Sequence, residues 1–127
     1  TSDEARLALL MESVGGFVYY VSVAGITGTK SAEIRSIAES VARIRRFTAL
    51  PVAVGFGIRS AQQAAEVAKI ADAAVVGSAI VERIVAGLDE NGTISPETVE
   101  CVLQFVSELS SGVRGARTVG EMEPASR

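Results

Sequence analysis

The sequence predicts an α/β fold, the C-terminal portion of a (β/α)8 TIM barrel in which parallel strands alternate with helices. Three apolar segments each end in a glycine turn, as strands that are buried on both faces do: residues 17–28 (FVYYVSVAGITG), 52–57 (VAVGFG) and 73–78 (AAVVGS). Segments of helical period separate them. Three such strands alone would leave two apolar edges unpaired, whereas a closed barrel has none.

A complete barrel needs about 250 residues, and this chain has 127. The chain also begins in a predicted helix with no strand before it, so we expect the earlier strands to lie outside this sequence. The alternative is a small three-layer open sheet that is complete as it stands. We expect residues 1–112 to form the barrel portion and residues 113–127 to be a poorly structured tail, because the apolar periodicity stops there.

The first helix and strand follow from a capping pattern and a change of period. Thr1 and Glu4 form a T-x-x-E capping box, and Gly15 with Gly16 ends the helix. Residues 17–23 then have the composition of a strand. The apolar positions of the helix are Leu7, Leu10, Met11 and Val14.

The second unit begins after a loop at residues 24–30. Ser31 is placed to cap a helix, and Pro51 opens the second strand. The inner face of this helix is predicted from residues at spacings of three and four: Ile34, Ile37, Ala38, Val41 and Ile44.

The third unit begins with an S-x-x-Q capping box formed by Ser60 and Gln63. A helix of small residues follows, and Asp72 turns the chain into the third strand. A further helix over residues 78–88 starts directly at the end of that strand.

Asn91 and Gly92 are predicted to form a turn before the last helix. Ser95, followed by Pro96 at the first helical position, predicts where this helix begins. The packing positions of this helix are predicted to be Val99, Val102, Leu103, Val106 and Leu109.

Composition excludes several classes of function. The net charge of −3 gives nucleic acid no electrostatic attraction. No apolar run approaches the roughly 20 residues that cross a bilayer, and the start lacks the layout of a signal peptide, so we expect a cytoplasmic protein with no membrane partner. The chain has no histidine, so we expect no metal site. Cys101 has no intrachain partner and is expected to be a partly buried helix residue.

The glycine turns predict a site for phosphate. Loops that follow parallel strands lie on the same side of the sheet, so the three turns should converge on one anion. In barrels of this class the last two loops build the phosphate site with the N-terminus of a short extra helix, and here Gly55-Phe56-Gly57 and Gly77-Ser78 occupy those places.

Backbone N–H groups and the helix dipole can hold the dianion without a direct cation. Lys30 and Arg59 lie in adjoining loops, where each either assists or is a solvated surface charge.

Four segments together resemble the tryptophan synthase α subunit family: FVYYVS at residues 17–22, AGITG at 24–28, PVAVGFGI at 51–58 and VGSAIV at 76–81. The resemblance extends from the first helix to about Leu109 and corresponds to the last three strands of the family's barrel. It implies retro-aldol cleavage of indole-3-glycerol phosphate to indole and glyceraldehyde 3-phosphate. It also implies no cofactor in this chain and a partner β subunit that holds pyridoxal phosphate and receives the indole.

The resemblance implies roles for individual residues. Tyr19 matches the tyrosine at the indole end of the substrate pocket, and Thr27 matches the threonine of the mobile loop that closes over the substrate. Tyr19 could equally fill the barrel interior, because strand alternation alone does not choose its face. Phe56 is either a pocket wall or part of the core. The phosphate-binding backbone groups fall on Gly28, Gly57, Gly77 and Ser78.

The proposed cleavage needs an acid that protonates the indole carbon and a base that takes a glycerol hydroxyl proton, and carboxylates suit both roles. None of the fifteen acidic residues stands at the ligand-side end of a predicted strand. In the family the catalytic glutamate and aspartate belong to earlier strands and loops, so we expect no catalytic residue in this chain. The alternatives are another phosphate-binding barrel enzyme, acting on sugar or thiamine phosphates, and a non-catalytic phosphate-binding module.

Overall fold

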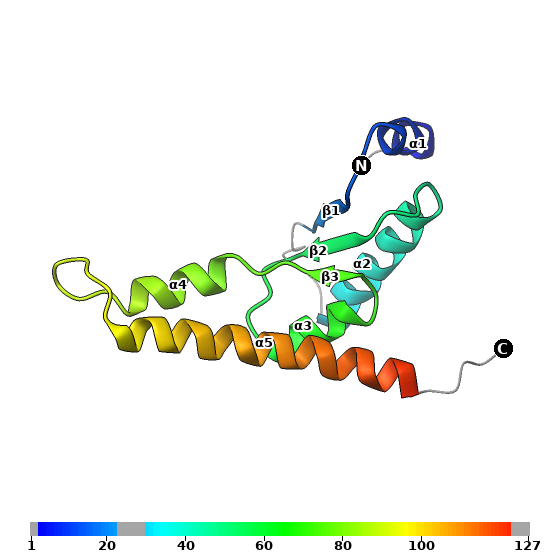
Figure 1. Cartoon of the computed structure of the whole chain (residues 1–127). Helices are drawn as coiled ribbons and strands as arrows, with labels where there is room; N and C mark the ends of the chain where they lie inside the picture. Colours follow the sequence, from blue (N-terminus) through cyan, green and yellow to red (C-terminus); the bar gives the residue numbers. More distant parts are fainter. Residues whose placement is uncertain (1–2, 23–29, 123–127) are drawn as a thin grey trace.

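A three-stranded parallel sheet forms the centre of the computed structural model, which describes residues 3–22 and 30–122 (Figure 1). The strands β1 (Val18–Val21), β2 (Val52–Gly55) and β3 (Ala73–Ala74) lie in the order β1-β2-β3. Val18 is paired with Val52, and Ala53 with Ala73. The predicted alternation of parallel strands with helices is confirmed.

One face of the sheet carries the helices α2 (Lys30–Arg45) and α3 (Ala61–Ala68). Side chains from this face and from both helices form an apolar core, to which Leu7, Phe105 and Leu109 also belong. The largest fully buried side chains of the core are Ile37, Val41, Val52, Val54, Ile58 and Val67.

The first helix, α1 (Glu4–Glu12), is capped by Asp3 and not by the predicted Thr1, which lies outside the described residues. The Asp3 carboxylate accepts a hydrogen bond from the Arg6 N–H at 2.8 Å. Threonine and aspartate are both favourable N-cap residues, so the local pattern did not distinguish Thr1 from Asp3. Of the predicted apolar face only Leu7 is buried.

Helix α2 begins at Lys30, so Ser31 lies inside its first turn. The cap prediction required Ser31 to precede the helix and is therefore wrong. The predicted inner face is confirmed at Ile37, Val41 and Ile44, which are all buried.

Helix α3 has the predicted capping box. The Ser60 hydroxyl oxygen accepts a hydrogen bond from the Gln63 N–H at 3.2 Å. The Gln63 side-chain oxygen in turn accepts from the Arg59 N–H at 2.7 Å. This reciprocal pair fixes the end of the loop between β2 and α3 to the start of α3.

Asp72 joins the sheet to both α2 and the C-terminal helix. Its carboxylate accepts hydrogen bonds from the Val52 N–H at 2.8 Å and from Arg45 at 3.0 Å. Its carbonyl accepts from the Arg117 guanidinium. The strand that follows, β3, is shorter than residues 73–78, although the Val75 N–H still donates to the Val54 carbonyl.

Helices α4 (Ser78–Ala86) and α5 (Pro96–Met122) form an antiparallel pair that projects beyond the sheet (Figure 1). The turn between them contains Gly92 with φ +73°, as predicted from Asn91-Gly92. The Arg83 guanidinium lies 3.8 Å from the centre of the Phe105 ring and ties the two helices together.

Helix α5 corrects three expectations. It continues to Met122, so residues 113–122 are helical and not a poorly structured tail; residues 123–127 lie outside the described residues. Of its predicted packing residues, Leu109 is buried as expected, whereas Val99, Leu103 and Val106 are exposed. Phe105, which was not predicted to pack, is also buried. Cys101 is also exposed, not partly buried.

Candidate functional site

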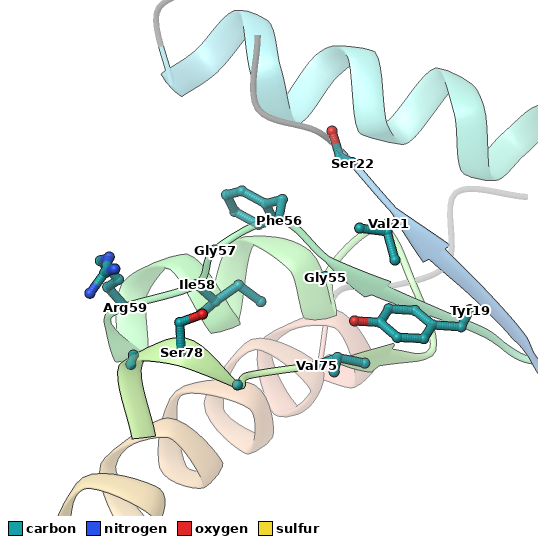
Figure 2. A pocket seen from close by; sticks show the side chains of 12 residues that line it. Tyr19, Val21, Ser22, Gly55, Phe56, Gly57, Ile58, Arg59, Val75 and Ser78 are labelled. Carbon is teal, nitrogen blue, oxygen red and sulfur yellow. The ribbon is translucent and has the colours of Figure 1, made fainter. Parts of the chain in front are cut away.

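A cavity of about 180 Å³ lies at the carboxyl ends of the strands, and we name it the glycine-loop pocket (Figure 2). It lies where β1 and β2 end and α4 begins. Five of the seven site residues predicted from the sequence line it: Tyr19, Phe56, Gly57, Gly77 and Ser78.

A contact of the neighbouring residue Tyr20 shows which face of the sheet Tyr19 occupies. The Tyr20 hydroxyl on the opposite face donates to Ser40 of α2, so Tyr20 belongs to the core side of the sheet. Tyr19 is 52% exposed and points across the pocket toward Gly55 (Figure 2). A Cβ atom at Gly55 would lie 2.8 Å from the Tyr19 hydroxyl, so the glycine leaves room for the ring.

The loop after β2 needs glycine at position 57. Gly57 has φ +80°, a left-handed conformation that side chains with a Cβ atom rarely adopt. Phe56 is half-buried, packs against the core and lines the pocket, so both roles that the sequence left open apply. Ile58 is buried and fixes the loop to the core.

The other wall is the N-terminus of α4. Gly77 is its N-cap residue, and no side chain within the described segments makes a capping hydrogen bond there. The first N–H groups of a helix have no acceptor inside the helix, and the dipole places partial positive charge at this end. Ser78 adds a hydroxyl beside those N–H groups. This end of the pocket therefore suits an anion.

Two predicted site residues, Thr27 and Gly28, lie outside the described residues. Lys30 is the first residue of α2, and its side chain is likewise not described. Their assignment to a lid and to the phosphate site stays a prediction.

Arg59 lies at the pocket end away from Tyr19 (Figure 2). Its guanidinium donates two hydrogen bonds to the Glu82 carboxylate of α4, at 2.5 and 2.8 Å. The hydrogen bond to Glu82 raises the pKa of Arg59 and lowers that of the Glu82 carboxyl. Arg59 is thus a paired residue and not a freely solvated charge.

Sequence reasoning missed five lining residues. Val21 follows Tyr19 by two positions, so strand alternation could have placed it on the same face. Ser22 follows β1 directly, and its N–H donates to the Gly55 carbonyl at 2.9 Å. The remaining three, which carry no polar side chain to draw attention to them, are Ile58, Val75 and Ala79.

The pocket offers binding groups, but its described lining supplies no carboxylate. Nor do three or more side chains of the types that bind metals gather anywhere in residues 3–22 and 30–122. No helix of the described part is long and apolar enough to cross a membrane.

A larger groove of about 530 Å³ lies between β3 and α5. Its walls are mainly apolar side chains, and its polar members include Asp72 and Arg117. It contains none of the strand-end glycines, so the glycine-loop pocket remains the better candidate for a ligand site.

Comparison with known proteins identifies relatives of this chain. The family model described as tryptophan synthase alpha chain matches residues 1–112. The tryptophan synthase alpha chain of Caulobacter vibrioides is 56% identical over 119 residues, which are 92% of this chain and 41% of that protein. The corresponding protein of Acidiphilium cryptum is 48% identical over 117 residues, again 92% of this chain and 42% of the relative.

Solved structures agree with these relatives. A tryptophan synthase structure from Mycobacterium tuberculosis matches 90% of this chain and 39% of its own with a TM-score of 0.70 and 36% identity. The alpha subunit of Campylobacter jejuni matches 86% of this chain and 40% of its own with a TM-score of 0.69 and 32% identity.

The chain therefore spans about two fifths of the length of the relatives it matches. The expected fold class, the C-terminal portion of a TIM barrel, is confirmed by the solved relatives. The family resemblance drawn from the glycine-turn segments is confirmed as well. The chain belongs to the tryptophan synthase alpha chain family.

Proposed function

We propose that this chain supplies the phosphate site of a carbon–carbon lyase that cleaves indole-3-glycerol phosphate to indole and glyceraldehyde 3-phosphate, a step of tryptophan biosynthesis. The observation that carries the proposal is the meeting of Gly57, Gly77 and Ser78 in one pocket at the N-terminus of α4. Family membership supports the reaction class.

In this proposal the main chain holds the phosphate. The N–H groups of Gly57, Gly77 and Ser78 donate to its oxygens, and Gly28 joins them from the loop after β1. The dipole of α4 adds attraction for the dianion. Since Glu82 already occupies the Arg59 guanidinium, backbone donors carry the recognition.

The rest of the substrate extends toward Tyr19 and Phe56, whose rings form an apolar wall for the indole. Thr27 belongs to a loop that closes over the substrate and excludes water. The two proton transfers fall to carboxylates other than the lining residues, so this chain alone is expected to bind phosphate without releasing indole. A partner β subunit with pyridoxal phosphate, a cytoplasmic location and the absence of a cofactor from this chain belong to the same proposal.

A chimera tests the proposed reaction. Residues 1–109 of this chain would replace the matching segment of the Caulobacter vibrioides relative, whose other residues supply the remaining strands. We expect the folded chimera to release indole from indole-3-glycerol phosphate. A folded chimera that binds glycerol phosphate without releasing indole would favour the non-catalytic binding module instead.

Alanine at position 57 is expected to abolish most phosphate binding. A Cβ atom in the left-handed region costs about 1–2 kcal/mol, so the loop rearranges and its N–H group turns away. Losing one hydrogen bond to a charged group weakens binding by about tenfold or more. Titration of the Gly57→Ala chain with glycerol phosphate, followed by NMR or calorimetry, measures the loss.

Gly16→Ala is the matched control. Gly16 has φ +81°, and a Cβ atom would meet nothing within 4 Å at either glycine. Gly16 lies outside the glycine-loop pocket. Both variants should lose similar stability, while only Gly57→Ala loses phosphate affinity. Equal affinity in the two variants would contradict the role of the Gly57 loop.

A further inference from the structure

The ion pair between Arg59 and Glu82 joins the two opposite walls of the glycine-loop pocket. Arg59 follows the Gly57 loop, and Glu82 lies in the second turn of α4, whose N-terminus is the opposite wall. The guanidinium and the carboxylate meet through two parallel hydrogen bonds, a geometry that restricts orientation as well as distance.

The backbone of Arg59 is itself fixed. Its N–H donates to the Gln63 side chain of the α3 capping box, and the preceding Ile58 is buried in the core. The Arg59 side chain therefore connects a rigid point on α3 to α4. The Gly57 loop and the α4 N-terminus are held at one separation as long as this connection is intact.

We propose that Arg59 and Glu82 are positioning residues that hold the Gly57 loop and the N-terminus of α4 at the spacing the anion requires. This inference rests on the proposed phosphate site. Both side chains are more than half exposed, at 57% and 58%, so the pair contributes little to overall stability. The pair acts on the geometry of the site. Its removal should therefore weaken phosphate binding while leaving the free energy of unfolding almost unchanged.

A different role for Glu82 gives the opposite result. If Glu82 only withdrew Arg59 from the pocket, its removal would free a cation for the phosphate and strengthen binding. Removing a negative charge near an anion site also favours the anion by electrostatics alone. A weaker affinity after Glu82→Gln would therefore not be explained by charge.

The test is a titration of the full 127-residue chain with inorganic phosphate, followed through its amide NMR signals. We expect Glu82→Gln and Arg59→Gln each to weaken binding by about two- to fivefold, the range of measured exposed ion pairs. The double variant should be no weaker than either single variant, because both remove one connection. The exchanged pair Arg59→Glu with Glu82→Arg should recover part of the affinity.

The Arg46–Glu4 ion pair provides the matched control. Its two side chains are 60% and 61% exposed and meet at 2.8 Å, away from the pocket lining. Glu4→Gln should change the unfolding midpoint as little as Glu82→Gln does and leave phosphate affinity unchanged.

Tighter or unchanged binding by Glu82→Gln would overturn the positioning role while leaving the phosphate site in place. A folded wild-type chain that binds no phosphate would overturn the proposed site itself, and the positioning role with it. The two failures are therefore distinguishable.

Discussion

Replacing Gly112 with alanine is expected to destabilise the chain, while the same replacement at Gly115, one turn further along α5, is expected to stabilise it. A Cβ atom at Gly112 would lie 2.4 Å from the Ala61 carbonyl oxygen and 3.1 Å from its carbonyl carbon. Those are main-chain atoms at the start of α3, so the contact is relieved only if the helices move apart. Overpacking of this kind costs about 1–3 kcal/mol.

Gly115 isolates the effect of the contact. It lies in the same helix, and a Cβ atom there would meet nothing within 4 Å. Alanine should gain about 0.5–1 kcal/mol at that position through helix propensity. Urea unfolding of the two variants, followed by far-UV circular dichroism, compares them. If Gly112→Ala were as stable as Gly115→Ala, the close approach of α3 and α5 would be wrong.

Replacing Asp72 with alanine is expected to cost about 1–3 kcal/mol of unfolding free energy, because it leaves the buried Val52 N–H without an acceptor. Val52 is fully buried, and its N–H donates to the Asp72 carboxylate. The same change removes the ion pair with Arg45. Asp72→Asn retains a side-chain oxygen for the Val52 N–H and should lose less.

The same site gives the chain a specific sensitivity to acid. The hydrogen bond from the Val52 N–H, followed by that from Arg45, lowers the pKa of Asp72 below its ordinary value. A lowered folded-state pKa contributes stability that is present above the unfolded pKa and is lost as the pH falls through the folded one. The stability difference between the wild type and Asp72→Asn should therefore shrink in acid, below about pH 4. A constant difference across pH 7 to pH 3 would contradict this reading.

Local patterns predicted the elements whose causes are local. The Ser60–Gln63 box and the Gly92 turn are short-range devices, and the structure has both. Helix α5 beyond residue 112 was missed because its causes lie far away in the sequence. The apolar periodicity stops near residue 112, but Arg117 donates to the Asp72 carbonyl, and Gly112 lies where α5 contacts α3.

The candidate site likewise combines features that local patterns predict with features that depend on distant residues. Placing glycines after parallel strands was enough to predict that Gly57 and Gly77 share a pocket. The face of Tyr19 was undecided, because β1 carries aromatic or apolar side chains on both faces, and the contact of Tyr20 with Ser40 settles it. The Arg59–Glu82 pair joins residues 23 positions apart on different elements, which no local pattern reports.

In the proposed site, main-chain amides from separate strand-end loops bind one phosphate group. An NMR titration of the 127-residue chain with glycerol phosphate tests it most directly. We expect the amide signals of Gly57, Gly77 and Ser78 to shift together and to saturate at one dissociation constant. Well-dispersed spectra in which these three amides stay unchanged, or respond at different concentrations, would contradict it.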